Sequence, residues 1–147
     1  MPQNFLSEAQ QQQIIAAIQQ AEKNTSGEIR VHMEPHCKKD SYERALEIFV
    51  QLKMHETALK NGVLFYVAYE DHKIAVIGDK GIHDKVHDNF WAAELTLLTE
   101  HFKQGAYADG LSKAIAAAGE KLREYFPYTD SDNDELSNDI SFGGTHE

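Results

Sequence analysis

Three acidic residues and one amide, drawn from three separate parts of the chain, have side chains suited to binding a cation. They are Glu28, Asn61, Asp79 and Asp84, and Asp79 stands in the sequence Gly-Asp-Lys-Gly at residues 78–81. Carboxylate and amide oxygens are ligands that Ca²⁺ and Mg²⁺ accept, whereas Zn²⁺ prefers cysteine and histidine. The residue types therefore favour Ca²⁺ or Mg²⁺ over Zn²⁺, provided that the fold brings the four residues together.

The elements around Asp79 read as a β-hairpin. Two apolar segments, residues 63–69 and 74–77, are joined by the short polar corner Glu70-Asp71-His72, and this pattern is typical of two antiparallel strands. Neither segment alternates apolar with polar residues. Strands that are apolar on both faces are covered on both faces, so we expect helices on each side of a central sheet.

A strand and a helix precede the hairpin. Residues 28–34 alternate, with Ile29, Val31 and Met33 on one face and polar side chains on the other, which predicts a half-covered strand. Asp40 or Ser41 can cap the next helix. We expect its buried stripe to consist of Tyr42, Ala45, Leu46, Phe49 and Leu52.

The connection from the first strand to the second determines which ends of the strands meet. A strand, helix, strand crossover gives parallel strands, and the hairpin then returns antiparallel. The starts of the first two strands and the end of the third therefore lie at one edge of the sheet. The geometry predicts that Glu28, Asn61, Asp79 and Asp84 gather at this edge as ligands of a metal ion.

The rest of the chain supplies further helices. Ser7 with Gln10 opens one helix, a second carries an aromatic and leucine stripe up to Phe102, and a third ends at Phe126 before Pro127. We predict an α/β protein: a three-layer α/β/α sandwich with a mixed central sheet of three to four strands and helices on both faces.

We expect residues 1–127 to form a single domain and residues 128–147 to be an acidic, flexible tail. Three apolar residues, Leu136, Ile140 and Phe142, are its candidate anchors to the domain. Asp130, Asp132 and Asp134 imitate the start of an EF-hand loop, but Glu135 occupies the position that needs glycine and Ser141 the position that needs a bidentate acid. We reject that motif.

Composition excludes several classes of function. The 147 residues include 24 acidic and 14 Lys or Arg residues, for a formal net charge of −10, so nucleic-acid and membrane-surface binding are disfavoured. Cys37 is the single cysteine, which excludes an intramolecular disulfide and fits a reducing compartment. Residues 1–13 lack the pattern of a secretory signal, and no apolar run reaches the roughly 20 residues of a membrane span. We expect a cytoplasmic monomer.

Two other groups of residues compete with the cation site. His83 and His87, spaced i and i+4 with Asp84 and Asp88 beside them, could hold Zn²⁺ on a helix face. Five residues at the opposite edge of the sheet include a cysteine and two histidines. Cysteine beside histidine is typical of a thiol nucleophile, but the sequence lacks the glycine-rich turn that presents a nucleophile in many enzymes. The five residues are His36, Cys37, Asp40, Asp71 and His72.

The candidate ligands also fit purely structural roles. Asp79 can cap the helix that follows it, and Asn61-Gly62 can form a helix-ending turn. Glu28 can pair with Arg30 or Lys80.

The order and spacing of several short motifs resemble the TPM domain family. The motifs are Thr25-Ser26-Gly27-Glu28-Ile29, the helix opening at Asp40, Asn61-Gly62-Val63-Leu64, Ile77-Gly78-Asp79-Lys80-Gly81-Ile82, and the stretch from Phe102-Lys103-Gln104-Gly105 to Gly110-Leu111. The resemblance covers residues 6 to 126 and is closest to a short soluble bacterial branch with an acidic Asn-Asp-Glu-Leu segment, here residues 133–136.

This resemblance implies an α/β/α sandwich, divalent cation binding by acidic loop residues and, for some members, a weak acid phosphatase activity. Asp79 and Asn61 match the family pattern best. Glu28 replaces a glutamine that is common in the wider family, and Asp40 matches a recurring acid that is either a cap or part of a second cation site.

Three functions follow as hypotheses. The first is a cation-binding domain without an assigned cellular role. The second is a metal-assisted phosphatase, for which no nucleophile or arginine clamp is evident. The third is an interaction module that recruits an unidentified protein partner through the hairpin tip or the acidic tail.

Overall fold

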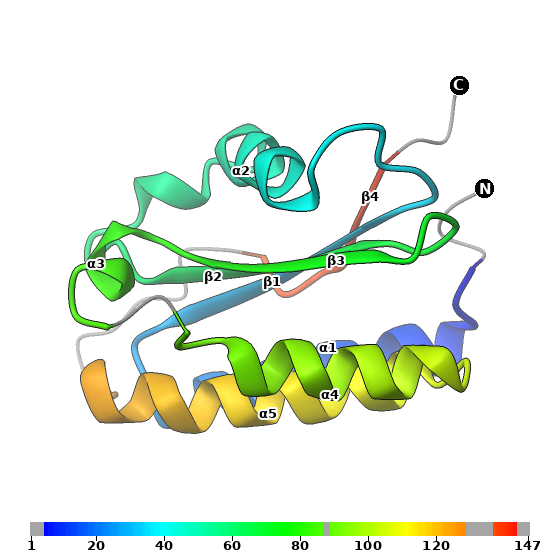
Figure 1. The fold of residues 1–147 in the computed structure, drawn as a ribbon. Helices are drawn as coiled ribbons and strands as arrows, with labels where there is room; N and C mark the ends of the chain where they lie inside the picture. The colour runs from blue at the N-terminus through cyan, green and yellow to red at the C-terminus, as the bar shows by residue number, and fades with distance from the viewer. Residues whose placement is uncertain (1–4, 87–88, 129–136, 144–147) are drawn as a thin grey trace.

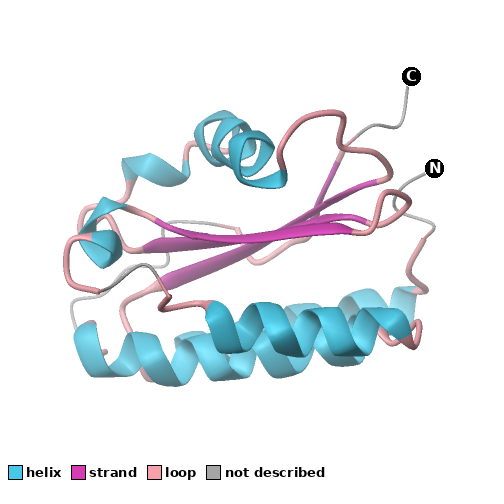
Figure 2. Ribbon diagram, in the orientation of Figure 1, coloured by secondary structure: helices cyan, strands magenta, loops and turns pink. Residues whose placement is uncertain are grey.

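The computed structural model describes residues 5–86, 89–128 and 137–143. Within these residues a mixed sheet has the strand order β3-β2-β1-β4 (Figures 1 and 2). The strands are β1 (Glu28–Glu34), β2 (Gly62–Ala68), β3 (Lys73–Gly78) and the short β4 (Ser141–Phe142). The β2 and β3 strands form the predicted hairpin.

Helices cover both faces of the sheet, which confirms the predicted three-layer sandwich. One face carries α2 (Ser41–Gln51) and the short 3₁₀ helix η2 (Met54–Glu56), above the sheet in Figure 1. The other face carries α1 (Glu8–Glu22), α4 (Ala92–Lys103) and α5 (Tyr107–Tyr125). The single turn α3 (Lys80–His83) lies beside the sheet edge where β3 ends.

Strand directions agree with the crossover argument. β1 pairs parallel to β2 with Glu28 opposite Gly62, and β2 pairs antiparallel to β3 with Val63 opposite Gly78. The starts of β1 and β2 and the end of β3 therefore meet at one edge of the sheet. We call this the Asp79 end and the opposite edge the Glu34 end.

Two hydrophobic cores fill the space between the layers. The larger lies under α1, α4 and α5 and includes Val63, Phe65 and Val67 of β2, whereas the smaller lies under α2 and includes Leu64 and Tyr66 of the same strand. Every residue of β2 is buried. This is the behaviour expected of a strand that is apolar on both faces.

Two predictions about the α2 side of the sheet were wrong. The polar face of β1 is buried rather than half covered, and Glu34 is only 2% exposed. In α2 the side chains of Tyr42 and Leu46 are 51% and 42% exposed, while Ile48 is buried. The orientation of α2 that exposes Tyr42 and Leu46 also lets Arg44 reach Glu34 of β1.

Local capping matches the sequence signals. Ser7 and Gln10 form a capping box at the start of α1, and Asp40 caps α2 by accepting from two backbone N–H groups. Phe90 and Trp91, the first aromatic residues of the predicted stripe that ends at Phe102, precede α4, and both are buried.

The C-terminal segment contributes to the sheet where it is described. Ser141 and Phe142 pair with His32 and Met33 of β1, and Ile140 and Phe142 pack on the larger core. The third predicted anchor, Leu136, and the acidic repeat at residues 130–134 lie outside the described residues. Within the part of the chain that is described, none of the helices is long and apolar enough to cross a membrane.

Candidate cation-binding site

Glu28 and Asp79 lie in one cross-strand row at the Asp79 end. Glu28 pairs with Gly62 in the register of β1 and β2, and the Asp79 N–H donates to the Gly62 carbonyl at 2.9 Å. Side chains alternate along a strand, so Glu28 and Asp79 point to the face that α2 covers. Gly62 between them has no side chain, and two strand spacings put the Cα atoms of Glu28 and Asp79 about 10 Å apart.

Asp79 leaves one carboxylate oxygen without a partner. The side chain is 9% exposed; its Oδ1 accepts a hydrogen bond from the Lys80 N–H at 2.7 Å, which caps α3. Its Oδ2 is buried and lacks a hydrogen-bond partner among the described residues. Burying such an oxygen is costly unless a donor or a cation compensates it. The predicted cap is thus present, but it uses only half of the carboxylate.

Asn61 lies at the same end of the sheet, directly before Gly62 of β2. The residue is 1% exposed, and its Nδ2 donates to the carbonyl of Ser26 at 3.1 Å. Its backbone carbonyl accepts from the Glu28 N–H at 3.3 Å. The amide nitrogen is thereby fixed against the segment before β1, and the amide oxygen is the atom that remains suitable as a cation ligand.

Sequence reasoning missed Thr57, which precedes β2 at the same end. Its hydroxyl oxygen Oγ1 is buried and, like Oδ2 of Asp79, lacks a hydrogen-bond partner within the described residues. The loop that carries it packs on the turn after Asp79, because the Gly81 N–H donates to the carbonyl of Lys60 at 2.8 Å. No signal in the sequence marked Thr57, since a single threonine in a polar stretch is unremarkable.

Asp84 lies apart from the other three predicted ligands. It follows α3 and caps its C-terminal end through its backbone N–H, and its side chain is exposed. It is therefore one helical turn away from Asp79 along α3. Of the competing zinc site, His87 and Asp88 lie outside the described residues.

The donors at the Asp79 end favour hard cations. Across residues 5–86, 89–128 and 137–143, no three Asp, Glu, His or Cys side chains are grouped as a metal site. A cation bound here would therefore depend on amide, hydroxyl and backbone carbonyl oxygens as well as on carboxylates. Such a mixed oxygen set suits Ca²⁺ or Mg²⁺ and does not suit Zn²⁺. The ligand roles themselves stay predictions.

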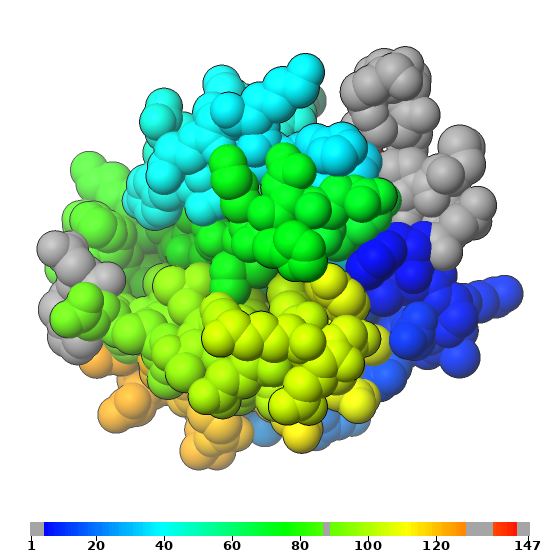
Figure 3. Space-filling model, turned by 45° about the vertical axis from the view of Figure 1, so that its right-hand side comes forward, coloured from blue at the N-terminus to red at the C-terminus, as the bar shows by residue number. Residues whose placement is uncertain are grey.

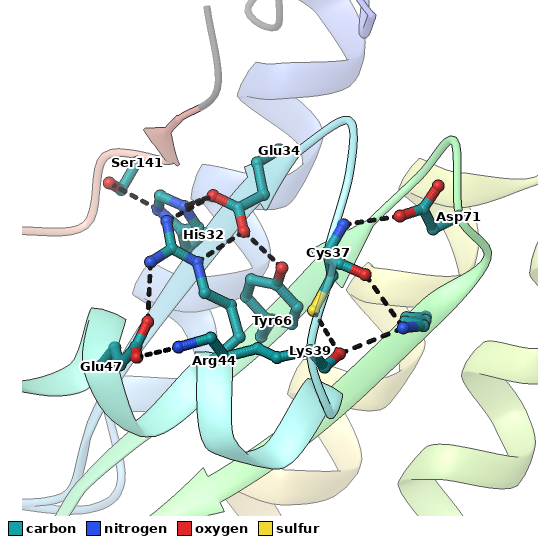
Figure 4. Close-up of polar contacts among 10 residues, drawn as sticks. His32, Glu34, Cys37, Lys39, Arg44, Glu47, Tyr66, Asp71 and Ser141 are labelled. Atoms are coloured by element: carbon teal, nitrogen blue, oxygen red, sulfur yellow. Dashed lines mark hydrogen bonds and ion pairs between the residues drawn. The ribbon is translucent and has the colours of Figure 1, made fainter. Parts of the chain in front are cut away.

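The Glu34 end holds a carboxylate whose oxygens are both occupied (Figure 4). Arg44 donates to both oxygens of Glu34, at 2.9 and 3.0 Å, and the Tyr66 hydroxyl donates to Oε2. His32 Nε2 lies 3.2 Å from Oε1. Burial opposes ionisation of Glu34, but the hydrogen bonds from His32, Arg44 and Tyr66 outweigh it and lower its pKa to about 2.

The side chains around Glu34 form a network of hydrogen bonds with it. The hydrogen bond to Glu34 raises the pKa of the Arg44 guanidinium above its usual value, and burial raises the pKa of the Tyr66 hydroxyl. His32 Nδ1 lies 3.0 Å from the hydroxyl of Ser141, which joins β4 to the network. This network stabilises the packing of α2 and β4 on β1.

Cys37 and its neighbours also have structural roles. The thiol is buried and donates to the carbonyl of Lys39 at 3.1 Å, while the Cys37 N–H donates to Asp71 at 2.7 Å. The hydrogen bond to His36, followed by that from Cys37, lowers the pKa of Asp71. Asp40 is the cap of α2. These contacts favour a loop-ordering role over the nucleophile hypothesis.

Comparison with known proteins agrees with this architecture. The TPM domain family model matches residues 1–121. The solution structure of the BA42 protein from the psychrophilic bacterium Bizionia argentinensis is 48% identical, with a TM-score of 0.88 over 95% of this chain and 96% of that one. No curated protein matches the chain.

Two more distant structures share the fold. An N-terminal domain from P. gingivalis has a TM-score of 0.66 at 20% identity, covering 85% of this chain and 83% of its own. An N-terminal domain from Corynebacterium glutamicum has a TM-score of 0.63 at 14% identity, covering 97% and 82%. The fold, a mixed sheet between two helical layers, places the chain in the class of α/β sandwich proteins. The match to the family model over residues 1–121 shows that the chain belongs to the TPM domain family.

Proposed function

We propose that this TPM domain binds a divalent cation, Ca²⁺ or Mg²⁺, at the Asp79 end of its sheet. The observation that carries the proposal is the Oδ2 atom of Asp79, which is buried and unpaired among the described residues. A carboxylate oxygen in this situation gains strongly from a cation, because the cation replaces the missing donor and neutralises the buried charge.

Asp79 is the principal ligand in this proposal. Asn61 contributes its amide oxygen, and Glu28 contributes a carboxylate across Gly62. Asp84 is exposed one turn beyond Asp79, so it serves at the periphery, where it attracts the ion or holds it through water. The bound cation would lower repulsion between acids in a chain of net charge −10.

The same cation would act as a Lewis acid if the domain hydrolysed phosphate esters. That extension has less support, because two of the three arginines have carboxylate partners and the third lies within β1. Arg44 is held by Glu34 and Glu47, Arg123 pairs with Glu120, and burial lowers the pKa of Arg30 within β1. We therefore propose cation binding without catalysis as the function.

Thermal unfolding with and without cation tests this proposal. Ligand at 100 times its Kd stabilises the folded state by about 2.7 kcal/mol, which raises Tm by roughly 5 to 10 °C in a chain of this size. The parent protein should show this rise in millimolar Ca²⁺ or Mg²⁺ relative to EDTA. Asp79→Asn keeps a side chain that can cap α3 but removes the charge, so its Tm should not respond.

Asp40→Asn is the matched control. Asp40 also caps a helix, but its Oδ2 accepts hydrogen bonds from the N–H groups of Tyr42 and Glu43, so this variant should respond to cation as the parent does. A parent Tm that stays the same in both cations would refute the proposal. A response that survives in Asp79→Asn would move the site elsewhere.

A further inference from the structure

A concave site lies at the far end of the hairpin from Asp79. It is a cavity of about 180 Å³ between the β2–β3 turn, the last turns of α4 and the start of α5. On the face shown in Figure 3, the green hairpin meets the yellow end of α4 in this region. Ala68 and Ile74 of the strands and Phe102 of α4 contribute its apolar lining.

Aromatic contacts hold the wall of this cavity in place. Tyr69 and Tyr107 both line it, and both contact Phe5, with ring centroids 3.9 Å apart in a stacked pair and 4.8 Å apart in an edge pair. The ring of Phe102 lies 4.5 Å from that of Tyr107. A wall ordered in this way can accept a planar apolar group at little entropic cost.

Basic side chains line the rim of the cavity. His72 and Lys103 line it and are exposed, and Lys73 lines it while its ammonium group is fixed by the carbonyls of Cys37 and Lys39 at 2.9 and 3.1 Å. Among the described residues that line the cavity, none is acidic. That composition contrasts with a chain that has 24 acidic and 14 Lys or Arg residues.

We propose that this cavity binds a small amphipathic carboxylate, one with a single aromatic ring or a short aliphatic chain as its body. The volume of the cavity is sufficient for the apolar part of such a ligand, since an apolar cavity of about 150 Å³ is enough to admit benzene. The lining supports the head group, since Lys103 carries a positive charge, His72 can donate a hydrogen bond, and both side chains are exposed to solvent. The site is independent of the proposed cation site, which lies at the other end of β2.

A titration followed by ¹H–¹⁵N spectra tests the proposal with three probes. Benzoate has both body and charge, benzyl alcohol has the body without the charge, and acetate has the charge without the body. Benzoate should shift the amides of Tyr69, His72 and Phe102 in a saturable way. Benzyl alcohol should shift the same amides with an affinity about fivefold or more lower, because it lacks the charged contact, and acetate should shift none of them.

Two lysine variants provide a matched comparison. Lys103→Met keeps the apolar stem at the rim and should weaken benzoate binding about fivefold, the effect of one partly exposed charge contact. Lys23→Met removes an equally exposed lysine that does not line the cavity, and it should leave the affinity unchanged. Thr99→Phe, at an exposed lining position on α4, should abolish binding by blocking the cavity.

Several outcomes would overturn this inference. It fails if 10 mM benzoate shifts none of these amides, if benzyl alcohol binds as tightly as benzoate, or if both lysine variants behave alike. Addition of EDTA should not change benzoate binding. Failure here would leave the cation proposal intact, because the latter is measured by the response of Tm to Ca²⁺ and Mg²⁺.

Discussion

The two ends of the sheet each bury a carboxylate, but they satisfy it in opposite ways. Glu34 has hydrogen bonds to both oxygens from an arginine, a tyrosine and a histidine, and its pKa is lowered to about 2. Asp79 uses one oxygen to cap α3 and leaves the other buried without a hydrogen-bond partner in the described residues. A buried acid therefore does not by itself indicate a ligand site.

The two carboxylates differ in whether both of their oxygens have hydrogen-bond partners among the described residues. Glu34 is a structural residue because each of its oxygens already has donors, so a cation there would have to displace Arg44. Asp79 has one buried carboxylate oxygen, Oδ2, that lacks a hydrogen-bond partner among the described residues. This comparison can be tested by changing one end at a time.

The largest effect should follow from loss of the Glu34 charge. Glu34→Gln leaves Arg44 without its buried counterion, and breaking such a pair costs about 3 kcal/mol or more. Urea unfolding measures this loss. Glu47→Gln is the control, because Glu47 also bonds to Arg44 but is far more exposed, and it should cost less than about 1 kcal/mol. Equal losses of stability in the two variants would show that the burial of Glu34 does not strengthen its pair with Arg44.

Acid should remove the same stabilisation from the parent protein. The pKa of Glu34 is about 2 in the folded state against 4.5 as its ordinary value. Its contribution is therefore complete above pH 4.5 and is lost as the pH falls toward 2, a change of about 3 kcal/mol. Unfolding free energies measured from pH 6 to 2.5 should fall less steeply for Glu34→Gln than for the parent. Parallel pH profiles would contradict this assignment.

At the Asp79 end, the turn after the strand should tolerate no added side chain at Gly81. A Cβ there would lie 2.3 Å from the Leu59 carbonyl oxygen, so Gly81→Ala should cost about 2 to 3 kcal/mol through forced backbone shifts. Gly105→Ala is the comparison, since that position has open space and a φ of +73°, and it should cost about 1 kcal/mol. Thermal unfolding of both variants measures the difference.

The smallest effect should come from Asp79 itself. In EDTA, Asp79→Asn should change the free energy of unfolding by no more than about 1 kcal/mol, because asparagine also caps helices and Oδ2 of Asp79 has no hydrogen-bond partner among the described residues that the change could remove. Chemical unfolding in chelator gives this value. A loss as large as that of Glu34→Gln would mean that Asp79 is already satisfied within the protein.

Much of the Asp79 end could be predicted from the sequence, because it depends on local patterns. The apolar runs and polar corner predicted the hairpin, and the crossover predicted the strand directions, so the meeting of Glu28, Asn61 and Asp79 at one edge followed from connectivity. The sequence places Asp84 in the group because it follows closely after the end of the third strand, but the helix α3 lies between Asp79 and Asp84.

The Glu34 end could not be predicted, because its contacts are long-range. The charges of Glu34 and Arg44 are each ordinary in the sequence, and only the rotation of α2 joins them across ten residues. That rotation also moved Tyr42 and Leu46 out of the predicted buried stripe. The sequence predicts Ile140 and Phe142 as apolar anchors but does not predict β4, since a two-residue strand has no periodicity to detect.

Paramagnetic broadening by Mn²⁺, which substitutes for Mg²⁺ and Ca²⁺ at oxygen sites, compares the two ends in one spectrum. At substoichiometric Mn²⁺ the backbone amides of Gly62, Asp79 and Lys80 should disappear first, while those of Glu34 and Cys37 stay sharp, and excess Mg²⁺ should restore the lost signals. Uniform broadening across the surface, or broadening first at the Glu34 end, would contradict the proposal that the unpaired oxygen of Asp79 marks a cation site.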